Sequence, residues 1–309
     1  MKPQTGDKKI FLISLSMIGL AAALWGLDGV VLTPRLNNLH VFLVVFLLHA
    51  LPFLVMNVVL FKHYKELKKL DTKAFYSLVW VSVFGGALGT ITIVYALFIV
   101  NFQQLSVVVL LQKFQPVFAI LLATILLKEK LSKNFLAWGL IAVLAGYLLT
   151  FGFHLPHLTE GNNTTQAALL SLLASFSFAS STVFSKNLLD KVNYISATFF
   201  RYGLTAILML AVVLISGHLR EVSQVTETNW MVLGIISATT GTGAILLYYY
   251  GLKHVKASHS TLMELFFPIT TIVLDYFVNG AILSPIQWVS ASVMVFAILK
   301  ASASVKLHD

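Results

Sequence analysis

The sequence has no cysteine and few charged residues. Of its 309 residues, 11% are Asp, Glu, Lys or Arg, whereas an ordinary soluble domain carries about 25%. The missing cysteines exclude disulfide bonds, thiol nucleophiles and thiolate metal sites. The shortage of charge excludes a soluble globular enzyme, because a water-soluble protein of this size needs a much larger polar surface.

Sequence motifs of several enzyme classes are also missing. The chain has no P-loop, no GxGxxG after a predicted strand, no HExxH and no Asp-rich prenyltransferase motif. ATP-driven transport within this chain is therefore excluded, and we predict a protein that is not an enzyme and uses no cofactor and no metal. One alternative of another class is an integral-membrane enzyme that acts on lipids. It would need a catalytic cluster at a membrane surface, and the sequence shows no such cluster.

The sequence does have long apolar runs. Hydrophobic residues make up 58% of the chain, and the mean hydropathy is +0.87. A helix needs roughly 20 apolar residues to cross a bilayer core about 30 Å thick. Ten segments meet this condition: 10–32, 41–61, 74–100, 103–127, 134–153, 166–189, 194–216, 229–252, 257–279 and 285–304. We expect an all-α polytopic membrane protein with ten transmembrane helices in the lipid bilayer.

The Lys and Arg residues are distributed unevenly between the connections. If the N-terminus is placed inside, 17 of the 21 Lys and Arg residues fall on the inner side, and only Arg35 and Arg220 fall outside. The remaining two, Lys113 and Arg201, lie within predicted spans. Cytoplasmic loops carry such an excess of positive charge. We therefore predict a cytoplasmic (inner or plasma) membrane location with both termini in the cytoplasm. The net charge of +9 then reports topology, and no binding to nucleic acid is expected.

The two halves of the chain share landmarks in the same order. The matching positions are offset by 150 to 155 residues: His49 with Arg201, Leu97 with Leu252, Pro116 with Pro268, and Trp138 with Trp288. An odd number of spans in each half makes the second half enter from the opposite side. This predicts two inverted five-helix repeats, 1–153 and 166–309, joined by an external linker at 154–165. Such repeats build secondary transporters, with the substrate near the midplane between the halves.

Several motifs resemble the EamA branch of the drug/metabolite transporter superfamily. They are Trp25-Gly26, the block from Gln112 to Ala119 that runs on to Lys128-Glu129-Lys130, Trp138-Gly139, and the second copy Glu264 to Pro268 followed by Trp288. The resemblance implies a secondary transporter that moves a small organic solute by alternating access, and it favours export of amino acids or related metabolites. Import of a cationic or aromatic metabolite is the alternative. The family's acidic residue is Glu129 here, but the second copy has Ala281 at that place.

Ionisable groups inside a bilayer are costly and usually face a cavity or a partner. Lys113 shares a helical face with Gln112 and Gln115, and Glu264 precedes Pro268 by one turn. Either these groups bind the substrate or they form a structural ion pair, and we expect Lys113 and Glu264 to lie close together. Arg201 is expected either to bind an anionic group or to hold backbone carbonyls. Candidate gating or proton-coupling groups are Asp28, His49, Glu264 and Asp275.

Aromatic and proline residues complete the predicted site. Trp25, Tyr95 and Tyr248 fall on spans that border the cavity in the resembled family, where they can stack on an organic ligand. The alternative is an interfacial aromatic belt. Pro116 and Pro268 are expected to kink their helices and open room for the substrate. The expected partners are a small-molecule substrate and the bilayer, and the sequence leaves open a monomer or a homodimer.

Overall fold

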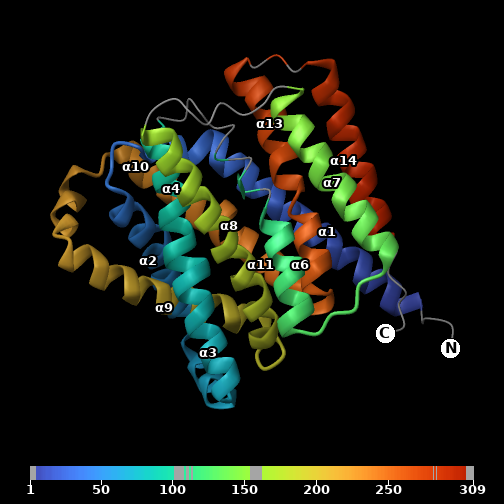
Figure 1. Cartoon of the computed structure of the whole chain (residues 1–309). Coiled ribbons are helices and arrows are strands. Elements are labelled where there is room, and N and C mark those ends of the chain that lie inside the picture. Colours follow the sequence, from blue (N-terminus) through green and yellow to red (C-terminus); the bar gives the residue numbers. More distant parts are fainter. Residues whose placement is uncertain are drawn as a thin grey trace.

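The structure is a computed structural model that describes residues 5–100, 108, 111–112, 114–153, 162–280, 282 and 284–303. Every regular element in these residues is a helix. The helices pack side by side in one bundle (Figure 1). The all-α membrane-protein fold predicted from the sequence is thus confirmed.

The described residues of the first half form α-helices, π-helices and 3₁₀ helices. They are α1 (Thr5–Leu27), the π-helix η1 (Asp28–Leu32), the 3₁₀ helix η2 (Thr33–Leu36), α2 (Val41–Leu60), the 3₁₀ helix η3 (Phe61–Lys69), α3 (Thr72–Trp80), the π-helix η4 (Val81–Leu88), α4 (Gly89–Ile99), α6 (Gln115–Leu126) and α7 (Lys133–Phe151).

The second half follows a similar order. It contains α8 (Asn162–Leu189), α9 (Tyr194–Ile215), the 3₁₀ helix η5 (His218–Gln224), α10 (Glu227–Ile236), the π-helix η6 (Ser237–Gly241), α11 (Thr242–His254), α12 (Ala257–Met263), α13 (Phe266–Asn279) and α14 (Pro285–Ala303).

Polar side chains begin several helices and glycines end others. Asp71 accepts a hydrogen bond from the Ala74 amide at the start of α3, and Asn193 does the same for the Ser196 amide in α9. These caps satisfy amide groups that have no partner within the helix. Gly217 follows α9 with φ of 79°, a conformation that glycine adopts without steric cost.

Seven helical stretches of the described residues are long and apolar enough to cross a membrane, and the last of them contains the turn at Glu264 and Leu265. They are 8–36, 41–69, 72–99, 165–189, 194–215, 227–254 and 257–278. Three further apolar helices, 115–126, 133–149 and 285–301, are shorter. Each of the ten predicted segments overlaps one of these helices, while the number of ten complete spans stays a prediction.

The helix pairs that pack together are unchanged when the two halves are exchanged. The exchange turns α1 into α8, α2 into α9, α4 into α11, α6 into α13 and α7 into α14. The pairs α2–α9 and α7–α14 then map onto themselves, α1–α11 maps onto α8–α4, and α1–α13 maps onto α8–α6. This is the contact pattern that a two-fold relation between the halves produces.

Complete breaks replace the kinks predicted at the two prolines. Pro116 is the second residue of α6, which follows a turn at Phe114, and Pro268 is the third residue of α13. A proline nitrogen cannot donate to the carbonyl four residues earlier. At the second break, the Glu264 carbonyl accepts instead from the Phe267 amide at 3.0 Å, in a tighter turn.

Glycines allow the helices around the centre to approach closely. A Cβ atom added to Gly85 would lie 2.1 Å from the Ser181 hydroxyl, and one added to Gly86 would lie 2.1 Å from the Thr205 hydroxyl. Neither distance is possible for real atoms, so η4 rests directly on α8 and α9. This packing brings the two halves together beside the cluster described next.

Candidate functional site

Glu264 lies at the break between α12 and α13 and forms the centre of a polar cluster. Its Oε1 atom accepts hydrogen bonds from the Tyr248 hydroxyl at 2.8 Å and from the Ser260 hydroxyl at 3.4 Å. Its Oε2 atom accepts a hydrogen bond from the Gln115 side-chain amide. The Thr182 hydroxyl lies 2.6 Å from the Tyr248 oxygen. We call these five residues the Glu264 cluster.

The Glu264 cluster is built from both halves of the chain. Gln115 begins α6 in the first half, while Thr182, Tyr248 and Ser260 come from α8, α11 and α12 in the second. Because the Tyr248 hydroxyl donates its hydrogen bond to Glu264, the Thr182 hydroxyl is the donor in the hydrogen bond between Thr182 and Tyr248. Three donors therefore point at one carboxyl group, which is the surrounding that an ionised carboxylate needs away from bulk water.

Trp25 extends the Glu264 cluster with an aromatic surface. The rings of Trp25 and Tyr248 have centroids 5.4 Å apart and an interplanar angle of 56°. Tyr248 is buried, whereas Trp25 on α1 is only partly buried. The two rings thus contact each other, and part of the Trp25 surface stays free to touch a ligand.

Two charged side chains hold the turn between α11 and α12, the helices that carry Tyr248 and Ser260. Glu129 accepts hydrogen bonds from the Ala257 amide at 2.8 Å and the Ser258 amide at 3.2 Å, which are the first two amides of α12. Lys186 donates to the carbonyl oxygens of residues 252, 253 and 255 at 2.8 to 2.9 Å, around the end of α11. Each charge thus meets the helix end of opposite polarity.

Arg201 forms a second buried cluster beside the first. Its guanidinium group donates to the Gly85 carbonyl at 2.9 Å and to the Tyr249 hydroxyl at 3.1 Å, and Ser185 lies 2.9 Å from the same hydroxyl. The side chain is 8% exposed. Of the two roles expected for Arg201, the observed contacts are those of a group that holds a backbone carbonyl.

The candidate gating residues lie in separate places. Asp28 is the first residue of η1, is half-buried, and accepts a hydrogen bond from Thr33 at 3.1 Å. His49 is buried in α2, where its Nδ1 lies 2.8 Å from the Val45 carbonyl and its ring lies 5.3 Å from that of Tyr202. Neither residue shares a hydrogen bond with the Glu264 cluster among the interactions of the described residues.

Two other predicted site residues, Gln112 and Tyr95, share no hydrogen bond with the Glu264 cluster among the interactions of the described residues, and the side chains of two more, Lys113 and Asp275, are not described. Lys113 lies outside the described residues, so its expected proximity to Glu264 stays a prediction. Gln112 is helical and half-buried just before the turn at Phe114. Asp275 is in α13, and its side chain lies outside the described part of the chain. Tyr95 is exposed on α4.

Sequence reasoning missed the hydroxyl groups of α8 and the position of Glu129. Thr182 and Ser185 lie one helical turn apart and bond to Tyr248 and Tyr249, respectively. The signal was a run of Ser and Thr residues in an otherwise apolar helix, 175–185, since buried hydroxyls need partners. No local pattern could place Glu129, because its partners lie 128 and 129 residues away.

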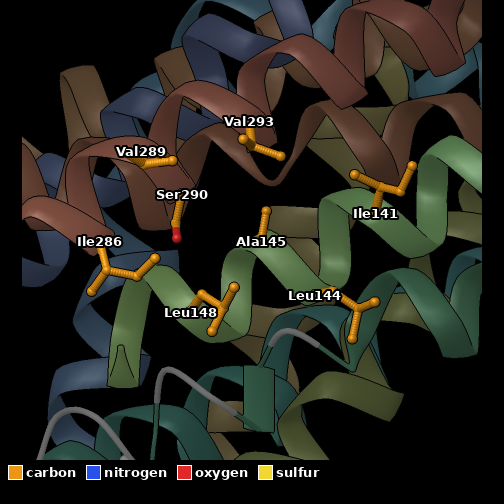
Figure 2. Close-up of a pocket in the computed structure, with 8 residues that line it drawn as sticks. All are labelled: Ile141, Leu144, Ala145, Leu148, Ile286, Val289, Ser290 and Val293. Atoms are coloured by element: carbon orange, nitrogen blue, oxygen red, sulfur yellow. The ribbon is translucent and has the colours of Figure 1, made fainter. Parts of the chain in front are cut away.

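A groove between α7 and α14 has a different character. Its volume is about 240 Å³, and it is lined by Ile141, Leu144, Ala145, Leu148, Ile286, Val289, Ser290 and Val293 (Figure 2). The Ser290 hydroxyl is the one polar side-chain group among these lining residues. The groove therefore lacks the convergent polar groups that orient a small solute, which the Glu264 cluster has.

Outside the spans, a histidine pair joins the start of α2 to η5. The rings of His40 and His218 stack with centroids 3.5 Å apart, and His218 Nδ1 lies 2.6 Å from the Glu221 carboxylate. Burial, together with the neighbouring His218, lowers the pKa of His40. The hydrogen bond to His218 lowers the pKa of Glu221. This contact is built for a neutral His40.

Known proteins match this chain over nearly its whole length. A riboflavin transporter, ImpX, of Fusobacterium nucleatum subsp. nucleatum is 48% identical over 287 residues, which cover 93% of this chain and 96% of that protein. One solved crystal structure has a TM-score of 0.65 over 97% of this chain and 98% of its own, at 15% identity. That likeness shows the fold alone.

The sequence model of the EamA-like transporter family matches twice, at residues 12–152 and 165–302. The two matches together cover most of the chain, and the predicted resemblance is confirmed. The chain belongs to the EamA-like transporter family and is a membrane transporter of a small molecule.

Proposed function

We propose that this protein carries riboflavin, or a closely related flavin, across the membrane. The observation that carries the proposal is the 48% identity to a riboflavin transporter over nearly the full length of both chains. The chemistry of the cluster agrees with such a substrate. A flavin has a flat aromatic ring with polar edges, and Trp25 and Tyr248 supply an aromatic surface beside the Glu264 carboxylate.

The exchange symmetry of the helix contacts supports transport by alternating access. A site between two related halves can open to either side when one half rocks against the other. The Glu264 cluster draws residues from both halves and lies beside the broken helices before Pro116 and Pro268. We further propose inverted repeats and cytoplasmic termini, because the lysine-rich connections all fall on one side.

Export of amino acids, which the family resemblance favoured, receives no support from the comparisons. The relative that covers the chain is a flavin transporter, and the expected alternative, a transporter of an aromatic metabolite, fits this relative better. The direction in which the substrate moves depends on the gradient to which its transport is coupled. Glu264 is the candidate proton carrier, and exchange of one solute for another is the competing mechanism.

The test is flavin flux in proteoliposomes. Purified protein is reconstituted, and riboflavin entry is followed by its fluorescence with and without an imposed pH gradient. We expect saturable flux that empty liposomes lack. Flux that ignores the pH gradient but rises when riboflavin is loaded on the far side would show exchange. Absence of both flux and riboflavin binding in wild-type protein would refute the proposed function.

The role of the Glu264 charge can be tested with a variant and a matched control. Glu264→Gln keeps the size of the side chain but removes its charge, and Glu66→Gln makes the same change in η3, outside the cluster. We expect the first variant to lose at least about tenfold in flux, equal to about 1.4 kcal/mol, and the second to keep wild-type flux. Equal flux in the two variants would remove Glu264 from the transport mechanism.

A further inference from the structure

We propose that Gln115 and Glu264 together recognise the imide edge of the flavin ring, with Glu264 accepting its N3–H and Gln115 donating to a neighbouring carbonyl. This inference rests on the proposed function and names the contacts that would select the substrate. It concerns the pyrimidine part of the isoalloxazine ring, where one N–H lies between two C=O groups.

The hydrogen bonds of Glu264 are unequal on its two oxygen atoms. Oε1 accepts from both Tyr248 and Ser260, while Oε2 accepts from Gln115 among the described residues. A carboxylate offers about four lone-pair sites in total. Oε1 is thus filled from the protein side, whereas the described residues leave Oε2 with capacity for one more donor.

The amide of Gln115 has matching capacity. Its Nε2 carries two hydrogens, and one of them is used by the bond to Oε2. The second hydrogen and the free lone pair of Oε2 belong to bonded neighbours, so they present a donor and an acceptor side by side. An N–H next to a C=O is the complementary edge, because its acceptor meets the amide and its donor meets the carboxylate.

Burial and aromatic contacts agree with a ligand at this position. Gln115, Glu264 and Trp25 are each partly exposed, while Tyr248 is buried behind them. Tyr248 bonds to Glu264, and its ring contacts the ring of Trp25 with 5.4 Å between their centroids. A ligand ring that bonds to Glu264 therefore lies next to both aromatic side chains. Edge hydrogen bonding and ring stacking can therefore act on one flat ligand together.

The experiment compares riboflavin with N3-methylriboflavin, in which a methyl group replaces the N3 hydrogen. Binding to detergent-purified wild-type protein is measured by quenching of flavin fluorescence. A hydrogen bond to a charged group predicts that methylation weakens binding by about 10- to 150-fold. This comparison needs no variant, so it is independent of any folding defect.

Variants locate the contact. In Glu264→Gln we expect the ratio between the two ligands to fall to about threefold, and Gln115→Ala should weaken riboflavin binding by about tenfold. Glu66→Gln and Gln224→Ala, which change the same residue types outside the cluster, should keep the wild-type ratio. An unchanged ratio in Glu264→Gln would overturn the inference.

The outcomes separate the two levels of the proposal. Wild-type protein that binds and transports both ligands equally would overturn the edge recognition and leave flavin transport standing. Wild-type protein that neither binds nor transports riboflavin would overturn both. A large ratio in wild-type protein that collapses in Glu264→Gln supports both.

Discussion

Glu129 is predicted to stabilise the protein through a helix to which it is not joined. Its carboxylate accepts the amides of Ala257 and Ser258 and also the Ser258 hydroxyl at 2.6 Å. The residue before α12, Lys256, makes no side-chain hydrogen bond that caps the helix. Glu129 thus fills the place of the missing cap. We therefore substitute Glu129 with Ala, which removes all three bonds, and with Gln, which keeps one oxygen acceptor but no charge.

The magnitude follows from these bonds. Loss of a helix cap costs about 1 kcal/mol, and each hydrogen bond to a charged group is worth about 1.5–3 kcal/mol. Because one carboxylate makes all three bonds, the contributions overlap, and we expect Glu129→Ala to lower the free energy of unfolding by about 3 kcal/mol. Glu129→Gln should cost about 1 kcal/mol, since its remaining oxygen can still accept an amide.

The assay is thermal unfolding of purified protein in detergent, followed by tryptophan fluorescence. For a chain of this length, 1 kcal/mol moves the melting temperature by about 2 °C. We expect Glu129→Ala to melt about 6 °C below wild type and Glu129→Gln about 2 °C below. Glu66→Ala is the control, because Glu66 makes only two long contacts, a 3.8 Å pair with the exposed Lys69 and a 3.3 Å hydrogen bond from the Asn193 side-chain amide, and we expect these to contribute about 1 kcal/mol together.

Two results would refute this reasoning. Equal melting temperatures for Glu129→Ala and Glu66→Ala would show that the three bonds of Glu129 add nothing beyond the two long contacts of Glu66. Equal effects of the Ala and Gln variants of Glu129 would show that the acceptor oxygen is unimportant. The variant also bears on function, because the turn held by Glu129 links the helices that carry Tyr248 and Glu264.

Three further predictions test other parts of the structure. Lys128 has φ of 56° after the end of α6, so Lys128→Gly should raise the free energy of unfolding by about 0.5–1 kcal/mol, measured by the same thermal unfolding. Gly86→Ala should lower it by more than about 2 kcal/mol, because the added Cβ would overlap the Thr205 hydroxyl; a melting temperature equal to wild type would contradict this close packing. The pKa of His40 is lowered where its ring stacks on His218. As the pH falls, a His40 that has left His218 therefore takes up a proton before a His40 that is in contact does. The contact is thus fully stable above about pH 6.5 and weakens as the pH falls below it. Hydrogen exchange at residues 37–42 should therefore quicken between pH 7.5 and 5.5 relative to a distant helix, and His40→Gln should remove the difference.

Local composition and order along the chain determined much of this protein. Apolar runs, lysine-rich connections and paired landmarks such as Pro116 and Pro268 were sufficient to predict a helical membrane transporter with two related halves. These features are readable because each depends on neighbours in sequence: a helix that crosses a bilayer needs about 20 consecutive residues that are predominantly apolar. Glu264, Gln115, Trp25 and Tyr248 could be selected in the same way, since polar and amphipathic groups are rare within such runs.

The tertiary structure decided which of those groups meet. The repeat relation of their spans predicted Lys113 beside Glu264, and this stays a prediction because Lys113 lies outside the described residues. Among the described residues, Gln115, Tyr248 and Ser260 bond to Glu264, and Thr182 bonds to Tyr248. Periodicity can only place residues on a face of their own helix, and the turn that breaks each helix before its proline shifts that face. The partners of Glu129 lie on a helix more than 120 residues away, and only packing of the two halves brings them within hydrogen-bond distance.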